Sequence, residues 1–441
     1  MSDAAPKHDL VHGTPLPAGA VDRGVALCLS GGGYRATLFH LGSILRLNQL
    51  GVLARLSTIT SVSGGSILNG VLATRWSKLV PNGAGVFSNI DEVLARPVRQ
   101  FCANDLRTRV LLGTRLNPAN LGVLVRDGFS VSGNFLADAY EPLYAQRLGE
   151  LPQPNPTTPR FVFCATNVRT GACWHFHGGP AARMGDFYAG YCDAGDVRVS
   201  EAVAASSSFP PGFSALRLRI PKDRLISRID PWGDERVISA KRAGLPASAL
   251  RQPFLTDGGV YDNLGVEPVW STFNTLLVSD AGRPLASIPS SGQNLVSRLR
   301  RVSEISMEQV GAVRKRWLVE GLLNKKRQGA IWTLSTQIED FPLPDARGYG
   351  TPLRGLINAI RTDLDAFSEG EIACLINHGY SLADAALRSR APDLCRYPGA
   401  PFQWPHPEWA IGESPAIALA QSGTRRVFRD SLRYIRASLI G

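Results

Sequence analysis

One pattern constrains the fold of this chain more than any other: an apolar strand, a turn of small residues and a helix follow one another twice near its start. The first strand is Val25–Leu29 and its turn is Ser30–Arg35. The second strand is Ser57–Ser61 and its turn is Ser63–Ser66. This order predicts a right-handed βαβ unit with both turns at the carboxyl ends of adjacent parallel strands. Open α/β sheets bind ligands at that edge, so we expect the functional site between the two turns.

Strand-like and helical segments continue to alternate well beyond this unit. Short apolar runs return at Phe161–Ala165, Phe254–Gly259 and Thr275–Ser279, and neither a repeat nor a convincing linker divides the chain. We therefore expect four parts: an N-terminal arm over 1–22, an α/β domain over 23–285, a loop-rich helical insertion into that domain at about 80–157, and a mainly helical C-terminal extension over 286–441 packed on the same domain.

Ser63 is the candidate nucleophile, within the sequence Ser61-Val-Ser-Gly-Gly65. A serine on a tight strand-to-helix turn is activated because small neighbours let the backbone bend and the helix dipole favours developing negative charge. The pattern departs from the usual G-x-S-x-G at Ser61. Small residues around a serine are also common in ordinary turns, so this motif alone does not establish a nucleophile.

The glycine run of the first turn, Gly31, Gly32 and Gly33, strengthens this interpretation. Acyl transfer needs backbone N–H groups directed at a developing oxyanion, and side chains would obstruct that approach. The run and Ala36 also fit a dinucleotide-binding turn, but no Asp or Glu occurs between residues 22 and 91 to hold a ribose. No Gly-Lys-Ser/Thr follows, which excludes a Walker A loop. A tight helix-packing turn remains the structural alternative.

A serine nucleophile needs a base, and two kinds of base are available. A triad of the α/β-hydrolase type would use His378 or His406, but that fold places several strands before its nucleophile, and only one clear strand precedes the strand of Ser63. The alternative base is Asp257, in Thr256-Asp-Gly-Gly-Val260 at the end of another strand. An isolated Asp-Gly-Gly is usually an ordinary turn.

Together these residues resemble the patatin-like phospholipases, serine lipid acyl hydrolases that use a Ser–Asp dyad and no catalytic histidine. Ser30–Arg35 looks like the glycine-rich loop of the family, Ser61–Gly65 like its nucleophile elbow and Asp257–Gly259 like its Asp-Gly-Gly motif. Between them, Ala204–Gly212 is similar to the family's Ala-Ser-x-x-x-Pro stretch. The resemblance covers about residues 24–282.

The resemblance implies a three-layer α/β/α fold with a mainly parallel central sheet. It implies that Ser63 attacks an ester carbonyl and that Asp257 accepts its proton. It also implies an oxyanion hole built from the amides of Gly31, Gly32, Gly33 and Gly64. Arg35 is expected to orient the loop or a substrate phosphate, unless it is a surface arginine at a helix start. No metal or other cofactor is implied.

The charge of the chain favours anionic partners, because 48 Lys and Arg against 37 Asp and Glu leave a formal charge of +11. No zinc-finger spacing or RRM-like motif accompanies the charge, so we expect no nucleic-acid partner. The basic segment 294–327 is predicted to be helical, with Leu295, Leu299, Val302, Val313 and Trp317 on its apolar side. This side either rests on an anionic membrane or packs on the sheet, and packing is the preferred interpretation.

The expected substrate is a phospholipid or another lipid ester. Two alternatives stay open: a soluble esterase or acyltransferase that uses another acyl donor, and a non-catalytic lipid-binding regulatory protein. An odd number of cysteines, seven, without a CxxC pair indicates a reducing compartment. The amino terminus lacks the layout of a secretory signal, and no apolar run approaches about 18 residues. We therefore expect a cytoplasmic protein, with peripheral membrane contact as an option.

Overall fold

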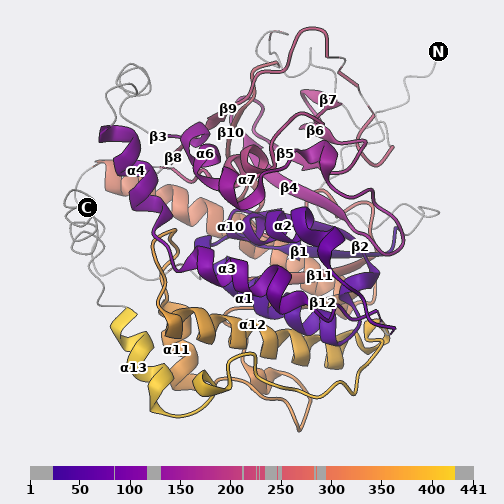
Figure 1. Cartoon of the computed structure of the whole chain (residues 1–441), viewed down its shortest axis with the longest axis vertical. Helices are drawn as coiled ribbons and strands as arrows, with labels where there is room; N and C mark the ends of the chain where they lie inside the picture. Colours follow the sequence, from indigo (N-terminus) through magenta and orange to yellow (C-terminus); the bar gives the residue numbers. More distant parts are fainter. Residues whose placement is uncertain are drawn as a thin grey trace.

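A mixed sheet crosses the middle of the molecule and helices cover both of its faces (Figure 1). The computed structural model describes residues 23–83, 85–116, 131–210, 213–224, 226–227, 229–233, 246, 251–282, 285 and 295–422. The arm predicted over 1–22 lies outside these residues. The α/β/α architecture expected from the resemblance is confirmed.

Parallel strands form the part of the sheet that carries the two turns. In spatial order they are β12 (Gln328–Thr333), β11 (Thr275–Asp280), β1 (Val25–Leu29), β2 (Leu56–Val62) and β4 (Arg160–Asn167). Each of these strands pairs in parallel with its neighbour, so the predicted βαβ unit is confirmed. Strand β12 was not expected, because it belongs to the extension that the sequence predicts to be mainly helical. The extension therefore contributes an edge strand as well as helices.

Antiparallel strands complete the sheet around β4. They are β5 (Ala172–His177), β6 (Arg183–Asp186), β7 (Gly190–Asp193), β9 (Leu216–Arg217) and β10 (Phe254–Asp257). Strand β2 pairs with residues 160–164 of β4, and β10 pairs with residues 165–167 from the opposite direction. The two strands therefore lie end to end beside β4, with their carboxyl ends facing each other. A separate small sheet joins β3 (Val131–Ser132) to β8 (Phe213–Ser214).

Strand β1 is buried on both faces and shows how the layers are built. Leu27 and Leu29 belong to the large core on one side of the sheet, whereas Ala26 and Cys28 belong to a smaller core on the other. Alternate residues of a strand point to opposite faces, so both faces must be covered. Helices α1 (Gly33–Gln49), α2 (Gly64–Arg75), α7 (Val199–Ser207) and α12 (Glu369–Arg390) contribute to the large core.

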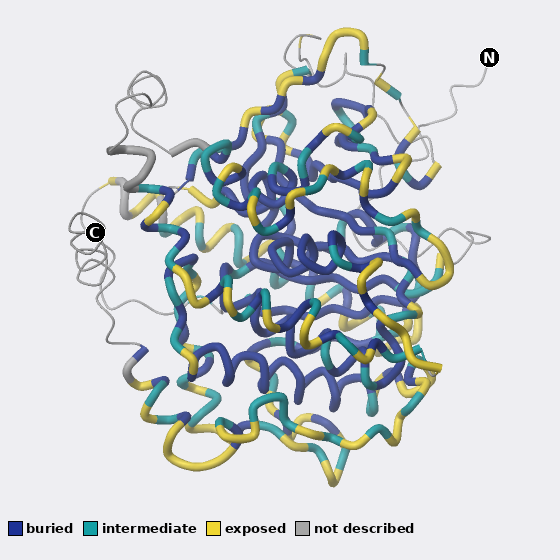
Figure 2. Tube along the Cα trace, in the orientation of Figure 1, coloured by how far each residue is buried: buried dark blue, intermediate teal, exposed yellow. Residues whose placement is uncertain are grey.

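Helix α12 ties the C-terminal extension to the rest of the fold. A Cβ on Gly42 of α1 would lie 1.9 Å from the carbonyl oxygen of Ile376, and one on Gly379 would lie 1.8 Å from that of Phe39. The two helices thus cross in backbone contact, and Figure 2 shows α12 buried along most of its length. Because this contact is so close, α12 and α1 belong to the same packed layer.

Helix α10 (Leu295–Leu323), unlike α12, is exposed over much of its length. Trp317 is half-buried and packs against the smaller core. Leu295, Leu299 and Val302 are exposed, so their predicted packing on the sheet is wrong. The N-terminal part of this helix therefore leaves these three side chains largely in solvent.

Shorter helices complete the structure. The described helices between residues 80 and 157 are η3 (Asp91–Ala95), α3 (Arg96–Cys102), α4 (Leu106–Leu116), α6 (Gly133–Tyr144) and η5 (Leu148–Glu150). The other helices of the described residues are η1 (Leu53–Arg55), η2 (Trp76–Lys78), α9 (Gly259–Asp262), η6 (Ile338–Asp340), α11 (Thr351–Ala359), η7 (Pro392–Leu394), η8 (Pro407–Trp409) and α13 (Glu413–Ser422). Within the ranges given above, no helix has the length and apolar character that a bilayer-spanning segment needs. All seven cysteines fall in those ranges and are buried, free thiols.

Candidate active site

The two predicted turns touch each other at the carboxyl edge of the sheet. A Cβ on Gly64 would lie 2.0 Å from the carbonyl oxygen of Gly33, and one on Gly65 would lie 2.5 Å from that of Leu29. The hydroxyl of Thr37 donates to the Gly64 carbonyl at 2.8 Å and joins the first helix to the second turn. Any side chain at Gly64 would push the turns apart, so glycine is required there by the close approach of two backbones.

Ser63 occupies the junction between β2 and α2. Its backbone has φ +50° and ψ −118°, a conformation that side chains other than glycine rarely adopt. Such a residue persists only when its surroundings hold it in place, and backbone strain of this kind clusters at functional sites. Ser63 is largely buried, and its hydroxyl-bearing carbon lies close to the first turn, 3.1 Å from where a Cβ on Gly31 would stand.

Asp257 ends β10 and is buried beside this serine. Its Oδ1 accepts a hydrogen bond from the Gly259 amide at 2.7 Å. Burial raises the pKa of Asp257 from 3.8 to about 6, although the Gly259 amide and the neighbouring Ser63 side chain act to lower it. The carboxylate is thus a stronger base than an ordinary aspartate.

The amides of the glycine run do not all point to the same place. The Gly31 amide donates to the Asn263 carbonyl at 3.0 Å, so its predicted role as an oxyanion donor is wrong. In contrast, the amides of Gly32, Gly33 and Gly64 make no hydrogen bond with the described part of the chain. Gly32 has φ +143° and Gly33 has φ +57°, values that favour glycine and that turn the loop into α1.

Arg35 is neither a surface arginine nor placed to bind a phosphate. Its side chain is buried, and its guanidinium donates to the carbonyl oxygens of Ile360 at 3.0 Å and Ala281 at 2.9 Å. The predicted phosphate contact is therefore wrong, because these donors are directed at backbone carbonyls inside the fold. The other predicted role, orienting the loop, agrees with these contacts.

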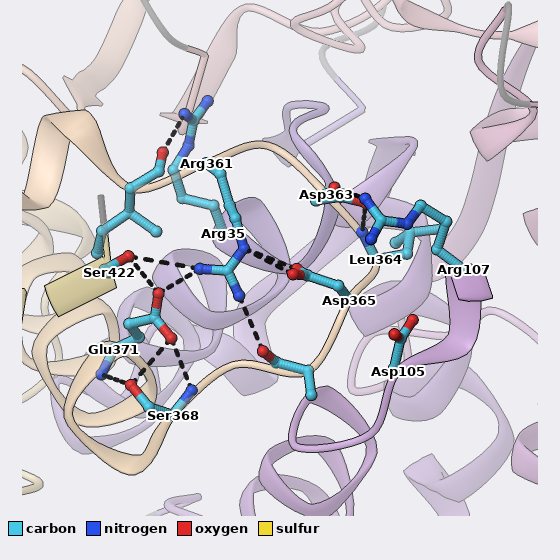
Figure 3. Close-up of polar contacts among 12 residues, drawn as sticks. Arg35, Asp105, Arg107, Arg361, Asp363, Leu364, Asp365, Ser368, Glu371 and Ser422 are labelled. Atoms are coloured by element: carbon cyan, nitrogen blue, oxygen red, sulfur yellow. Dashed lines mark hydrogen bonds and ion pairs between the residues drawn. The ribbon is translucent and has the colours of Figure 1, made fainter. Parts of the chain in front are cut away.

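The segment between α11 and α12 supports the glycine loop from outside. The carbonyl of Asp363 accepts a hydrogen bond from the Tyr34 amide at 2.9 Å, directly after the glycine run. Its carboxylate forms an ion pair with Arg107 at the start of α4. Figure 3 shows that Arg361 anchors the same segment, because its guanidinium contacts Asp365, Glu371 and Ser422. The C-terminal extension thus holds the loop in place.

Ser206, at the end of α7, has a role that the sequence did not reveal. Its carbonyl accepts hydrogen bonds from the amides of Ser63 at 3.2 Å and Gly258 at 3.1 Å, and its hydroxyl also accepts from the Ser63 amide at 3.0 Å. The next carbonyl but one, that of Ser208, accepts from the Asp257 amide at 3.1 Å. One helix end therefore holds both catalytic candidates. The serine run at 206–208 was the available signal, although no role could be assigned from it.

The histidines considered as bases are engaged elsewhere. His378 is buried and bonds through Nε2 to the carbonyl of Leu334 at 2.8 Å. His406 lies 3.4 Å from Glu408. Neither contact involves Ser63, so a triad through either histidine is not formed. Among the described residues, no three His, Cys, Asp or Glu side chains are grouped so as to hold a metal ion.

Comparisons with known proteins bear on this site. Residues 27–270 match the model of a protein family described as patatin-like phospholipase. Among solved structures, human GIVD cytosolic phospholipase A2 shares 14% identity over 60% of this chain and 42% of its own, with a TM-score of 0.34. VipD from Legionella pneumophila shares 14% identity over 84% of this chain and 68% of its own, with a TM-score of 0.32.

This chain therefore corresponds to less than half of the length of the human enzyme. No curated protein matches the sequence. The matched residues 27–270 include both turns and the Asp257 motif, and they make up more than half of the 441 residues. On this match, the chain belongs to the patatin-like phospholipase family.

Proposed function

We propose that this protein is a lipid acyl hydrolase of the phospholipase A type, which cleaves carboxylic esters through a dyad of Ser63 and Asp257. The observation that carries the proposal is that Ser63 and Asp257 lie at the facing ends of β2 and β10, close enough for the Ser63 side chain to lower the pKa of the Asp257 carboxyl. Membership of a phospholipase family supports a lipid ester as the substrate. The strained backbone of Ser63 supports its role as the nucleophile.

In this mechanism Asp257 takes the proton of the Ser63 hydroxyl while the oxygen attacks the ester carbonyl carbon. The carbonyl oxygen becomes an oxyanion, which the amides of Gly32, Gly33 and Gly64 stabilise. When the intermediate collapses, the bond to the alcohol breaks and Asp257 returns its proton to the leaving oxygen. An acyl group then remains on Ser63.

A water molecule completes the cycle. It gives a proton to Asp257 as it attacks the acyl carbonyl, the fatty acid leaves, and Ser63 recovers its proton. A carboxylate is a weak base for an alcohol, but the raised pKa of Asp257, about 6, brings it closer to neutral pH. Stabilisation of the oxyanion must supply most of the remaining rate enhancement.

A reducing cytoplasm is the proposed location, since every cysteine is a free thiol. The excess of positive charge favours attraction to anionic lipid headgroups, which would carry the enzyme to its substrate.

The test combines active-site labelling with product analysis. A fluorophosphonate probe is expected to label wild-type protein and not Ser63→Ala, whereas Ser303→Ala at an exposed serine of α10 should label normally. The wild-type protein should release fatty acid from phosphatidylcholine vesicles and hydrolyse a short-chain p-nitrophenyl ester. Hydrolysis of the soluble ester alone would identify an esterase, and absence of labelling would indicate a non-catalytic protein.

A further inference from the structure

Helix α10 is anchored at the same edge of the sheet as the candidate active site. Nη1 of Arg314 lies 2.9 Å from Oδ1 of Asp262, and Nζ of Lys315 lies 3.0 Å from Oδ2 of Asp280. Asp280 is the last residue of β11, and Asp262 ends the short helix that follows Asp257. Both ion pairs therefore join the middle of α10 to the carboxyl edge of the sheet.

The direction of α10 along the sheet follows from the contacts just after its C-terminal end. Arg327, just after α10, donates to the carbonyls of Trp270 and Phe273, which precede β11 on the amino side of the sheet. The C-terminal part of α10 thus lies along the sheet, and residues before Lys315 extend beyond its carboxyl edge. From Lys315 back to Leu295 a helix spans about 30 Å at 1.5 Å per residue. Figure 1 shows α10 reaching the side of the molecule where α4 lies.

The projecting part of α10 exposes a row of large apolar side chains. Leu295 is 70% exposed, Leu299 is 57% exposed and Val302 is 60% exposed. Their spacing of four and three residues places them on one face of the helix. Ile305 and Val310 are also exposed. Contiguous apolar surface of this kind marks an interaction site more often than scattered single residues do.

The charges of this part of α10 show which kind of partner fits. Where the structure describes side chains between 295 and 310, the exposed ones are apolar, uncharged polar or, at Arg298, cationic. The acidic residues Glu304 and Glu308 are only partly exposed, and Glu304 is paired with Arg301 at 3.7 Å. Among the described side chains, an apolar face beside the exposed cation Arg298, with carboxylates that are only partly exposed, complements an anionic lipid surface.

We infer that the exposed apolar face of α10, formed by Leu295, Leu299, Val302, Ile305 and Val310, docks this protein on membranes that contain anionic phospholipids. The inference rests on the proposed function, because it assigns the surface that brings lipid to the Ser63 edge of the sheet. Apolar side chains enter the headgroup region while Arg298 binds phosphate, and the ion pairs of Arg314 and Lys315 keep the active site beside the membrane.

The experiment compares vesicle binding of wild-type protein with the double variant Leu299→Asp/Val302→Asp. Vesicles of phosphatidylcholine with phosphatidylglycerol are used beside vesicles of phosphatidylcholine alone. The matched control is Leu323→Asp, because Leu323 is 77% exposed on the same helix but lies at its C-terminal end. We expect wild-type protein and the control to bind the anionic vesicles, and the double variant to bind roughly tenfold or more weakly.

Hydrolysis of a soluble p-nitrophenyl ester separates docking from chemistry, since all three proteins should hydrolyse it at the same rate. Equal vesicle binding by the three proteins, or no binding by wild-type protein, would overturn the inference. The inference would also be overturned if wild-type protein formed a dimer that the double substitution dissociates. The same holds if the double substitution lowered the melting temperature and left vesicle binding unchanged. If wild-type protein does not hydrolyse the p-nitrophenyl ester, the proposed function is refuted instead.

Discussion

Ser63 directly follows strand β2, and Asp257 is the last residue of strand β10. The two strands meet end to end along β4, where Val62 of β2 pairs with Cys164 and Asp257 pairs with Ala165. Since one strand runs parallel to β4 and the other antiparallel, both carboxyl ends meet at the same point. The serine and the carboxylate are therefore brought together by strand pairing and do not depend on a flexible loop.

Asp257→Asn is expected to change activity and stability in opposite directions. Removing the base should lower kcat for a p-nitrophenyl ester by about a thousandfold or more. At neutral pH the free energy of unfolding should rise by up to about 3 kcal/mol, because a neutral amide no longer carries the cost of a buried charge. Kinetics and denaturant unfolding measure the two effects.

The control for this exchange is Asp345→Asn, at an exposed carboxylate paired with Arg388. It should leave activity unchanged and should not stabilise the protein. Near-normal turnover by Asp257→Asn would contradict the dyad.

The pH dependence of catalysis should report the ionisation of Asp257. With its pKa at about 6, kcat/KM for the soluble ester is expected to rise from pH 5 and level off above pH 7. A constant kcat/KM across this range would be inconsistent with Asp257 as the base.

Asp257 should also make the stability of the fold depend on pH. Its contribution to stability should fall as pH rises, whereas kcat/KM rises. Between pH 3.8 and about 6 the folded protein holds this proton more tightly than the unfolded chain does. The contribution of Asp257 to the free energy of unfolding therefore falls as pH rises through this window. The difference between wild-type protein and Asp257→Asn, measured by unfolding at several pH values, isolates this contribution.

Gly64→Ala should damage both the site and the fold. Its Cβ would lie 2.0 Å from the Gly33 carbonyl, so the turns must separate, at a cost of about 1–3 kcal/mol in stability and roughly a hundredfold in kcat. Gly311→Ala on α10 meets open space and should stabilise the protein by about 0.5–1 kcal/mol. If both variants have normal kcat, the contact between the turns is not needed for catalysis.

Ser206→Ala tests the helix end that holds both candidates. The Ser206 hydroxyl accepts from the Ser63 amide and donates to the Cys164 carbonyl at 2.6 Å, so its removal should lower kcat roughly tenfold. Ser208→Ala is the matched control, because its hydroxyl donates to the Ala204 carbonyl of the adjoining helix at 2.7 Å, and its own carbonyl is retained in the variant. A similar kcat for both variants would show that the Ser206 hydroxyl is dispensable.

Arg35→Lys distinguishes a supporting arginine from a phosphate ligand. An ammonium group cannot reproduce both guanidinium hydrogen bonds to Ile360 and Ala281, so stability should fall by about 1–3 kcal/mol. Hydrolysis of a phospholipid and of a p-nitrophenyl ester should decline by the same factor. A loss confined to the phospholipid would instead indicate contact with its phosphate.

Local pattern was sufficient to predict the βαβ unit. Two consecutive strands joined by a helix pair in parallel, so Val25–Leu29 and the strand before Ser63 could be placed without knowledge of the rest. Strand β12 could not be predicted in this way, because Gln328–Thr333 holds only three consecutive apolar residues, after a polar residue and a glycine.

The sequence by itself determined the strand–turn–helix unit, the candidate serine and carboxylate, and the glycine loop, since each depends on residues adjacent in the chain. Only the tertiary structure decided which of these groups are free to contact a substrate and which are engaged inside the fold. The Gly31 amide is occupied by Asn263, and Arg35 is buried against Ile360. These partners lie more than 200 residues away, and hydrogen bonds at such separations depend on how the layers pack, which local sequence does not encode.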